Sequence, residues 1–217
     1  LAFMNSMILK HRLYDKHANV RIMIPRSVVI ATDYFDDFIR LNGLKYIISQ
    51  EFSDEEILSE FVSSTVPARL QQELKAYIQT VRTPLAVRSS SKLEDSHYQP
   101  FAGIYSTYMI PYVDNGDQML RLLLKAVKSV YASVYFATSR AYLSSSQNLI
   151  SEEKMAVIIQ EVCGTEQDGL FFPTFSGVAR SINYYPIGDE APADGVCNIA
   201  MGLGKLVVDG GRTLRFS

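Results

Sequence analysis

An arginine and three serines follow an apolar run in the segment LAVRSSSKLED, residues 85–95. The apolar run predicts a buried strand, and it leads into Arg88 and then into Ser89, Ser90 and Ser91. A guanidinium followed by hydroxyls and backbone N–H groups can hold phosphate oxygens in a two-pronged geometry. The same residues also fit a plain turn, in which Ser91 and Glu94 form a capping box and Arg88 pairs with a nearby carboxylate. The segment therefore indicates either an anion site or an ordinary strand exit.

Two glycine motifs could let the backbone approach a phosphate closely. Gly103, in the Phe-Ala-Gly sequence at 101–103, has no Cβ to block such an approach, although a glycine between extended segments also suits a bulge or bend. The GLGK sequence at 202–205 lacks the pattern of a phosphate loop, because Leu206 occupies the Ser/Thr position and a strand-like run follows. We therefore expect GLGK to be a turn between strands.

The apolar run MAVIIQEV, residues 155–162, ends in residues that could receive a purine base. Its β-branched residues predict a strand covered on both faces. A purine needs a backbone C=O and N–H at its edge and apolar walls on its faces, and Gln160, Glu161 and Val162 could provide that hinge. Such a hinge constrains its side chains loosely, so an ordinary strand exit fits the same pattern.

Composition and charge argue against several classes of protein. The 217 residues carry 21 Lys+Arg and 23 Asp+Glu, a formal net charge of −2, whereas binders of nucleic acid or anionic membranes need a basic excess. No apolar run reaches the roughly 20 residues that cross a bilayer. Cys163 and Cys197 show no CxxC or histidine spacing, which disfavours a zinc site and predicts a reducing, cytoplasmic compartment. One disulfide between these two cysteines stays open as an alternative.

Helical and extended segments alternate along the chain, which predicts an α/β or α+β fold. Apolar spacing and caps predict helices over 1–13, 33–44, 53–64, 67–81 and 117–143. Apolar and alternating runs predict strands over 20–25, 27–31, 85–87, 104–110, 155–162, 176–186 and 197–208. Residues 1–80 are thus expected to be mainly helical and 81–217 to carry the site. The first residue is not Met and both ends lie within predicted elements, so we expect an excised piece of a longer protein.

The order of these segments resembles the N-terminal nucleotide-binding region of the phosphoenolpyruvate synthase and pyruvate phosphate dikinase family, an ATP-grasp-like domain. The resemblance covers nearly all of the chain. It is most specific in one block, which comprises Val87, Arg88, Ser89, Ser90, Glu94, Asp95, Phe101, Ala102, Gly103 and Thr107. It implies an α+β, ATP-grasp-like domain that is incomplete at both ends.

The resemblance also implies a reaction and a set of site residues. That family passes a phosphoryl group from ATP to a histidine on a mobile carrier domain, and from there to pyruvate. Arg88 is the implied catalytic residue, which contacts the ATP phosphates. The segment from Ser89 to Gly103, with Thr107, is the implied cradle, and Gln160, Glu161 and Val162 are the implied adenine hinge. Mg²⁺ is the implied metal, with its ligands expected outside these 217 residues.

The chain departs from the family pattern at three places. The glycine-rich segment with a lysine that precedes the family's first helix has no counterpart here. Lys205 stands where relatives have an acid, and the segment SGVARS carries Arg180 near the place of a threonine. We therefore expect the chain by itself to be inactive. These departures leave two alternatives open: a non-catalytic nucleotide-binding or regulatory module, and a related kinase with a different acceptor.

Overall fold

Antiparallel strand pairs and amphipathic helices make up this chain, seen in a computed structural model that describes residues 2–16, 19–91, 105–145, 153–204, 207 and 211–217. The chain divides into two compact units, residues 1–161 and residues 162–217, which we call unit 1 and unit 2. The expected change of character near residue 80 falls inside unit 1. The structure is of the expected α+β class, with mixed helices and antiparallel sheets.

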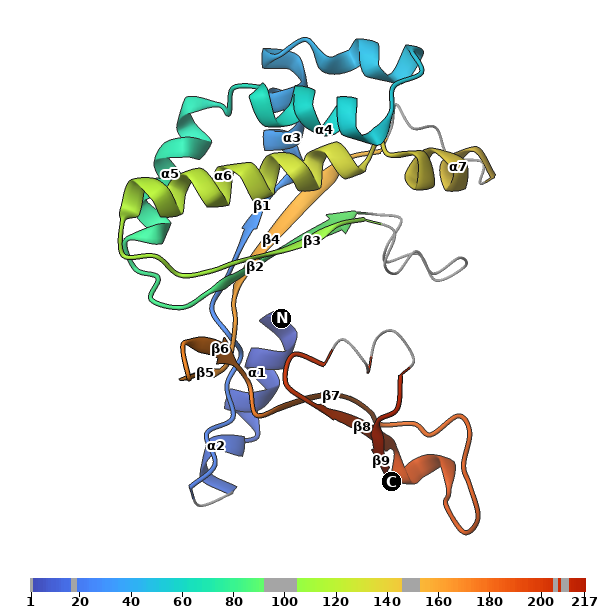
Figure 1. Cartoon of the computed structure of the whole chain (residues 1–217). Coiled ribbons are helices and arrows are strands. Elements are labelled where there is room, and N and C mark those ends of the chain that lie inside the picture. Colours follow the sequence, from blue (N-terminus) through green and yellow to red (C-terminus); the bar gives the residue numbers. More distant parts are fainter. Residues whose placement is uncertain (1, 17–18, 92–104, 146–152, 205–206, 208–210) are drawn as a thin grey trace. The chain divides into compact units, whose positions relative to one another are not determined.

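Unit 1 is built on a four-stranded sheet in the order β1–β4–β2–β3 (Figure 1). Its strands, in that order, are Ser27–Ile30, Met155–Glu161, Leu85–Ser91 and Thr107–Ile110. The central pair joins β2 to β4 along seven residues of each strand, with Leu85 opposite Glu161 and Ser91 opposite Met155. This pairing gives the sheet its register.

The helices α3, α4, α5 and α6 all lie on one side of this sheet (Figure 1). From residue 32 onwards the described helices are α3 (Thr32–Leu41), η1 (Leu44–Ser49), α4 (Asp54–Ser63), α5 (Ala68–Ile78), α6 (Gly116–Ser133) and α7 (Ala137–Ser145). Their apolar stripes meet in an aromatic core, where the rings of Phe38 and Phe61 lie 5.7 Å apart and those of Phe38 and Tyr131 lie 5.5 Å apart. The core thus lies between the helices and one face of the sheet.

The first two helices, α1 (Ala2–Lys10) and α2 (Leu13–Lys16), contain no buried side chain among the residues described. Residues 20–25, which we expected to form a strand, have no regular structure, and the sheet begins with Ser27. That expectation was therefore wrong. A strand needs a partner for its backbone, and β4 pairs with residues 27–30 instead. None of the described helices is both long and apolar enough to cross a membrane.

Local capping explains where several helices begin. Ser53 caps α4 as expected: its hydroxyl accepts from the Glu56 N–H at 3.2 Å, and the Glu56 carboxylate accepts from the Ser53 N–H at 2.9 Å. At the start of α3, Ala31 is the N-cap and makes no side-chain bond.

The helix predicted over 117–143 is divided into α6 and α7. The N–H of Ala137, the first residue of α7, donates to the carboxylate of Asp54 at 2.7 Å. The hydroxyl of Ser139 donates to the carbonyl of Ser133, the last residue of α6, at 2.7 Å. The side chain of Asp54, from α4, therefore caps the start of α7, and no local sequence signal reports such a contact.

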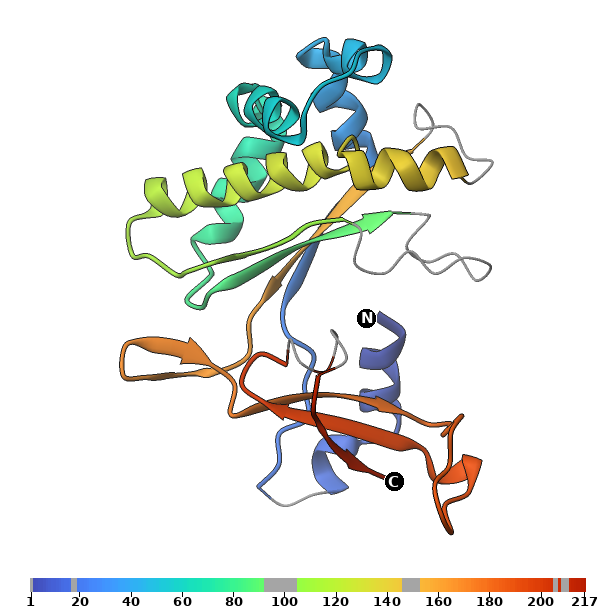
Figure 2. The ribbon, with the colours of Figure 1, turned by 45° about the vertical axis from the view of Figure 1, so that its right-hand side comes forward.

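Unit 2 is built mainly of short strands. A hairpin of β5 (Thr165–Gln167) and β6 (Leu170–Phe172) precedes a three-stranded sheet in the order β7–β8–β9 (Figure 2). The sheet strands are Phe175–Arg180, Val196–Met201 and Leu214–Phe216, and the one-turn helix η3 (Pro192–Asp194) lies between β7 and β8 in sequence. The GLG sequence follows β8 as a turn, as expected.

Candidate functional site

Strand alternation gives the unit 1 sheet two chemically different faces. On β2, Leu85 and Val87 are fully buried beneath the helices, whereas Arg88 is exposed. On β4, Val157 and Ile159 are fully buried, whereas their neighbours Ile158 and Gln160 are only half-buried. Successive side chains of a strand point to opposite faces, so the second set shares the side away from the helices. We call this side the open face. The expectation that MAVIIQEV is covered on both faces was therefore wrong.

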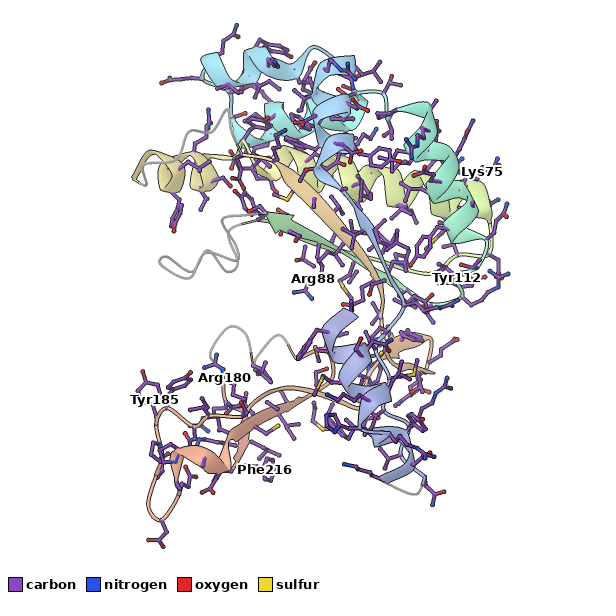
Figure 3. All side chains as sticks on the ribbon, turned by 180° about the vertical axis from the view of Figure 1, so that it is seen from behind. Lys75, Arg88, Tyr112, Arg180, Tyr185 and Phe216 are labelled. Atoms are coloured by element: carbon purple, nitrogen blue, oxygen red, sulfur yellow. The ribbon has the colours of Figure 1, made fainter. Side chains whose placement is uncertain are left out.

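Arg88 lies in the middle of β2. The expected strand of residues 85–87 continues through the serines to Ser91, because β4 pairs with the whole segment. The placement of Arg88 at a strand end was therefore wrong. Register puts Arg88 opposite Thr107 of β3 and opposite Ile158 of β4. Figure 3 shows the Arg88 side chain projecting from the side of the sheet opposite to the helices.

The open face brings together four of the residues that the sequence indicated. Arg88 and Thr107 are cross-strand neighbours, and Ser90 lies two residues further along β2, opposite Ala156. Gln160 lies on the same face, between Ala86 of β2 and Ser27 of β1. These four residues present one cation, two hydroxyls and a carboxamide in neighbouring rows.

The Arg88 side chain is unpaired within the described part of the chain. Its guanidinium is exposed and makes no hydrogen bond or ion pair with any residue in the described part of the chain. The alternative in which Arg88 pairs with an internal carboxylate therefore receives no support from these residues. By contrast, Arg26, Arg40 and Arg69 of unit 1 each form an ion pair.

Apolar side chains surround the polar ones on the open face. Val29, which register places beside Ile158, is 58% exposed, and Met109, beside Ala86, is 50% exposed. Sequence reasoning missed both of these residues. Alternation within the runs SVVI and TYMI would have identified them once the buried face was known. Exposed apolar side chains beside a cation suit a ligand with a flat ring and an anionic tail.

Two predicted residues turn their side chains the other way. Ser89 alternates with Arg88 and therefore lies on the helix-covered face, where it has interactions of its own. The Glu161 side chain is only 13% exposed, and its carboxylate lies 2.8 Å from the guanidinium of Arg26. The side chains of Ser89 and Glu161 are therefore directed away from a ligand on the open face.

The predicted hinge lies at the end of unit 1. Glu161 is its last residue and Val162 is the first residue of unit 2, so the chain passes from one unit to the other within the hinge. The side chain of Gln160 is oriented by its neighbour, since its Nε2 donates to the Ser27 hydroxyl at 3.3 Å. Gly103 and Lys205 lie outside the described residues, as does the rest of the segment 92–104.

The glycines of the two unit 2 motifs have structural roles. A Cβ on Gly177 of SGVARS would lie 2.5 Å from the carbonyl oxygen of Asn198 on the paired strand. Gly204 has a φ of +73°, and its Cβ would lie 2.7 Å from that of Ser176. Both motifs therefore fix the packing of β7 against the end of β8. Arg180, the departure within SGVARS, lines a cavity of about 400 Å³ in unit 2 (Figure 3).

The described residues contain no cluster of three metal-ligating side chains. Across the described ranges, no three His, Cys, Asp or Glu side chains are grouped so that they could hold a metal ion. Magnesium prefers carboxylate oxygens in near-octahedral geometry.

Comparison with known proteins gives a family match and several relatives. The family model described as pyruvate phosphate dikinase, AMP/ATP-binding domain, matches residues 6–214. The uncharacterized phosphotransferase YvkC of Bacillus subtilis is 29% identical over 69% of this chain and 17% of its own length. A probable phosphoenolpyruvate synthase of Staphylothermus marinus is 26% identical over 87% of this chain and 23% of its own length. A phosphoenolpyruvate synthase of Aeropyrum pernix is 24% identical over 70% of this chain and 20% of its own length. The chain spans about a fifth of the length of these relatives.

Proposed function

Because the chain belongs to the family of pyruvate phosphate dikinase AMP/ATP-binding domains, we propose that the open face of unit 1 binds ATP. Arg88 contacts the phosphates in this proposal, and the hydroxyls of Ser90 and Thr107 donate to the same oxygens. Gln160 and the backbone of Glu161 and Val162 border the adenine. Gly103 belongs to the proposed phosphate cradle, and the fold is proposed to be ATP-grasp-like.

One observation carries this proposal: the exposed guanidinium of Arg88, without a partner among the described residues, lies on the open face beside β4, the strand that ends in the predicted hinge. Arg88 is level with Ile158, three residues before Glu161 on β4. At 3.3 Å per residue, about 10 Å of strand separate the two levels. That separation is comparable to the reach from a purine ring to its outer phosphates, so one nucleotide can contact both.

The chemistry of phosphoryl transfer suits this equipment. The transferred group passes through a loose transition state with its charge spread over the equatorial oxygens, so the protein contributes mainly position and neutralising charge. A guanidinium offers two parallel N–H donors to such oxygens. Arg88 would hold and neutralise the phosphates, while the apolar residues around it limit the access of water. Mg²⁺ is proposed as the accompanying metal, with its ligands elsewhere.

In the whole protein, we infer that the phosphoryl group passes to a carrier histidine and then to pyruvate. The names of two relatives, both phosphoenolpyruvate synthases, support this route. YvkC is named only as a phosphotransferase, which supports the alternative of a related kinase with another acceptor. A non-catalytic nucleotide-binding module is the remaining alternative.

Incubation of the full-length protein with radiolabelled ATP tests the route. We expect an acid-labile, alkali-stable label on histidine that pyruvate discharges with formation of phosphoenolpyruvate. A label that pyruvate does not discharge would favour the kinase with another acceptor. ATP binding without any label would favour the non-catalytic module.

A further inference from the structure

Arg26 holds the end of the hinge strand by side chain and backbone together. The guanidinium of Arg26 lies 2.8 Å from the carboxylate of Glu161, the last residue of β4. The backbone N–H of Glu161 donates to the carbonyl of the same Arg26 at 3.0 Å. The guanidinium also donates to the carbonyl of Thr80, just after α5, at 3.3 Å. The exit of β4 is therefore tied to the segment before β1 and to the end of α5.

This arrangement is poorly explained by stability. Oε1 of Glu161 is buried and, in the described part of the chain, receives no directed hydrogen bond, so its contact with Arg26 is an ion pair only. The hydroxyl of Tyr77 is buried with no hydrogen-bond partner among the same residues. Burial, together with the charge of Glu161, raises the pKa of Tyr77 to about 12. The Arg26 side chain is 61% exposed, and an ion pair with an exposed partner contributes little to stability, whereas fixing one register is a documented use of ionic pairs.

We propose that Arg26 and Glu161 form a positioning pair that holds the backbone of residues 160–162 in the conformation that receives the purine base. This inference rests on the nucleotide site proposed above. It also indicates which backbone N–H of the hinge donates a hydrogen bond to the base. The N–H of Glu161 already donates to Arg26, so the ring nitrogen of the base takes its hydrogen bond from a later N–H, that of Val162 or Cys163. Neither Arg26 nor the Glu161 carboxylate touches the nucleotide.

Two probes separate the base half of the site from its phosphate half: adenosine and inorganic tripolyphosphate. Removal of the pair in Arg26→Ala lets the hinge sample other conformations, so binding must order about one residue again. Ordering one backbone residue costs about 1–2 kcal/mol, which corresponds to a roughly 5- to 30-fold weaker affinity. We expect that loss for adenosine and ATP, and an unchanged affinity for tripolyphosphate. Arg26→Lys, which keeps the charge, should recover part of the loss.

Calorimetric titration of the protein and its variants gives these affinities. Arg69→Ala is the matched control, because Arg69 also forms an exposed ion pair in unit 1, with Glu73 at 3.0 Å. It should bind both probes as the unmodified protein does. Arg26 is 61% exposed, so we expect Arg26→Ala to fold, and melting temperatures check this. Glu161→Gln, which keeps the shape of the side chain, gives a second test and should weaken adenosine binding in the same direction.

The possible failures are distinguishable. If the unmodified protein binds neither probe, the proposed nucleotide site is wrong, and this inference falls with it. If it binds both probes but Arg26→Ala and Glu161→Gln bind adenosine normally, the site stands and the positioning pair is refuted. Equal weakening of adenosine and tripolyphosphate in folded variants would also refute it, because a general disturbance of the sheet would then explain the result.

Discussion

Replacement of Arg88 by alanine should separate ligand binding from stability. The guanidinium is exposed and has no partner in the described residues, so its removal breaks no hydrogen bond or ion pair among them. Substitutions at such positions change the free energy of unfolding by no more than about 0.5 kcal/mol. A hydrogen bond to a charged group contributes about 1.5–3 kcal/mol, and this contribution to ATP binding would be lost. The expected loss of affinity is therefore roughly 10- to 150-fold.

Calorimetric titration with ATP and thermal unfolding measure the two quantities on the same samples. Arg88→Lys should be intermediate, because an ammonium keeps the charge but loses the planar fork that grips two oxygens at once. Arg121→Ala is the matched control, since Arg121 is an exposed arginine of α6 that also has no ion pair among the described residues. It removes the same charge from unit 1 and should leave the affinity for ATP within about twofold, as expected for a distant, screened charge.

Two results would refute the role of Arg88. An Arg88→Ala variant that binds ATP as tightly as the unmodified protein would show that the guanidinium does not meet the nucleotide. A loss of several degrees in melting temperature would show that its side chain supports the sheet. A domain of 150–250 residues loses about 2–4 °C per kcal/mol, so a shift of that size is readily measured.

Two further predictions concern unit 2. Gly177→Ala should destabilise the protein by about 1–3 kcal/mol, because its Cβ would lie 2.5 Å from a backbone oxygen of β8, whereas Gly116→Ala, which meets nothing within 4 Å, should be nearly neutral in the same denaturant titration. The guanidinium of Arg215 and the backbone N–H of Ile187 lower the pKa of Glu190 below its ordinary value of 4.5, so this carboxylate stabilises the fold fully above that pH and progressively less as the pH falls below it. Glu190→Gln should therefore lower the melting temperature at pH 7 and differ less from the unmodified protein at pH 3; an equal difference at both values would contradict the ion-pair explanation.

Several of the site residues were accessible from sequence order alone. Arg88, Ser90, Thr107 and Gln160 were chosen from motifs that are weak individually, and all four lie on one face of one sheet. The strand register that makes them neighbours could not be predicted from the sequence. Register depends on which strands pair, and β2 pairs with a strand that lies far along the chain.

The side-chain directions of the other candidates required the pairing as well. The prediction ended the strand at residue 87 and left the serines either in an anion site or in a turn, so alternation could not be applied to Ser89. Pairing with β4 extends β2 to Ser91 and turns the Ser89 side chain toward the helices. Val29 and Met109 were missed for the same reason, because a strand presents an exposed face only once its other face is covered.

Local signals within the sequence determined the helices α3 to α6, the start of α4 at Ser53 and the α+β class, because caps and a 3.6-residue period act within a few residues of chain. Only the tertiary structure decided that Arg88 has no partner among the described residues, that Glu161 turns away to Arg26, and that Asp54 caps α7. Each of these facts depends on how residues far apart in the chain are brought together. Such contacts form when the strands pair and the helices pack, so no local pattern encodes them.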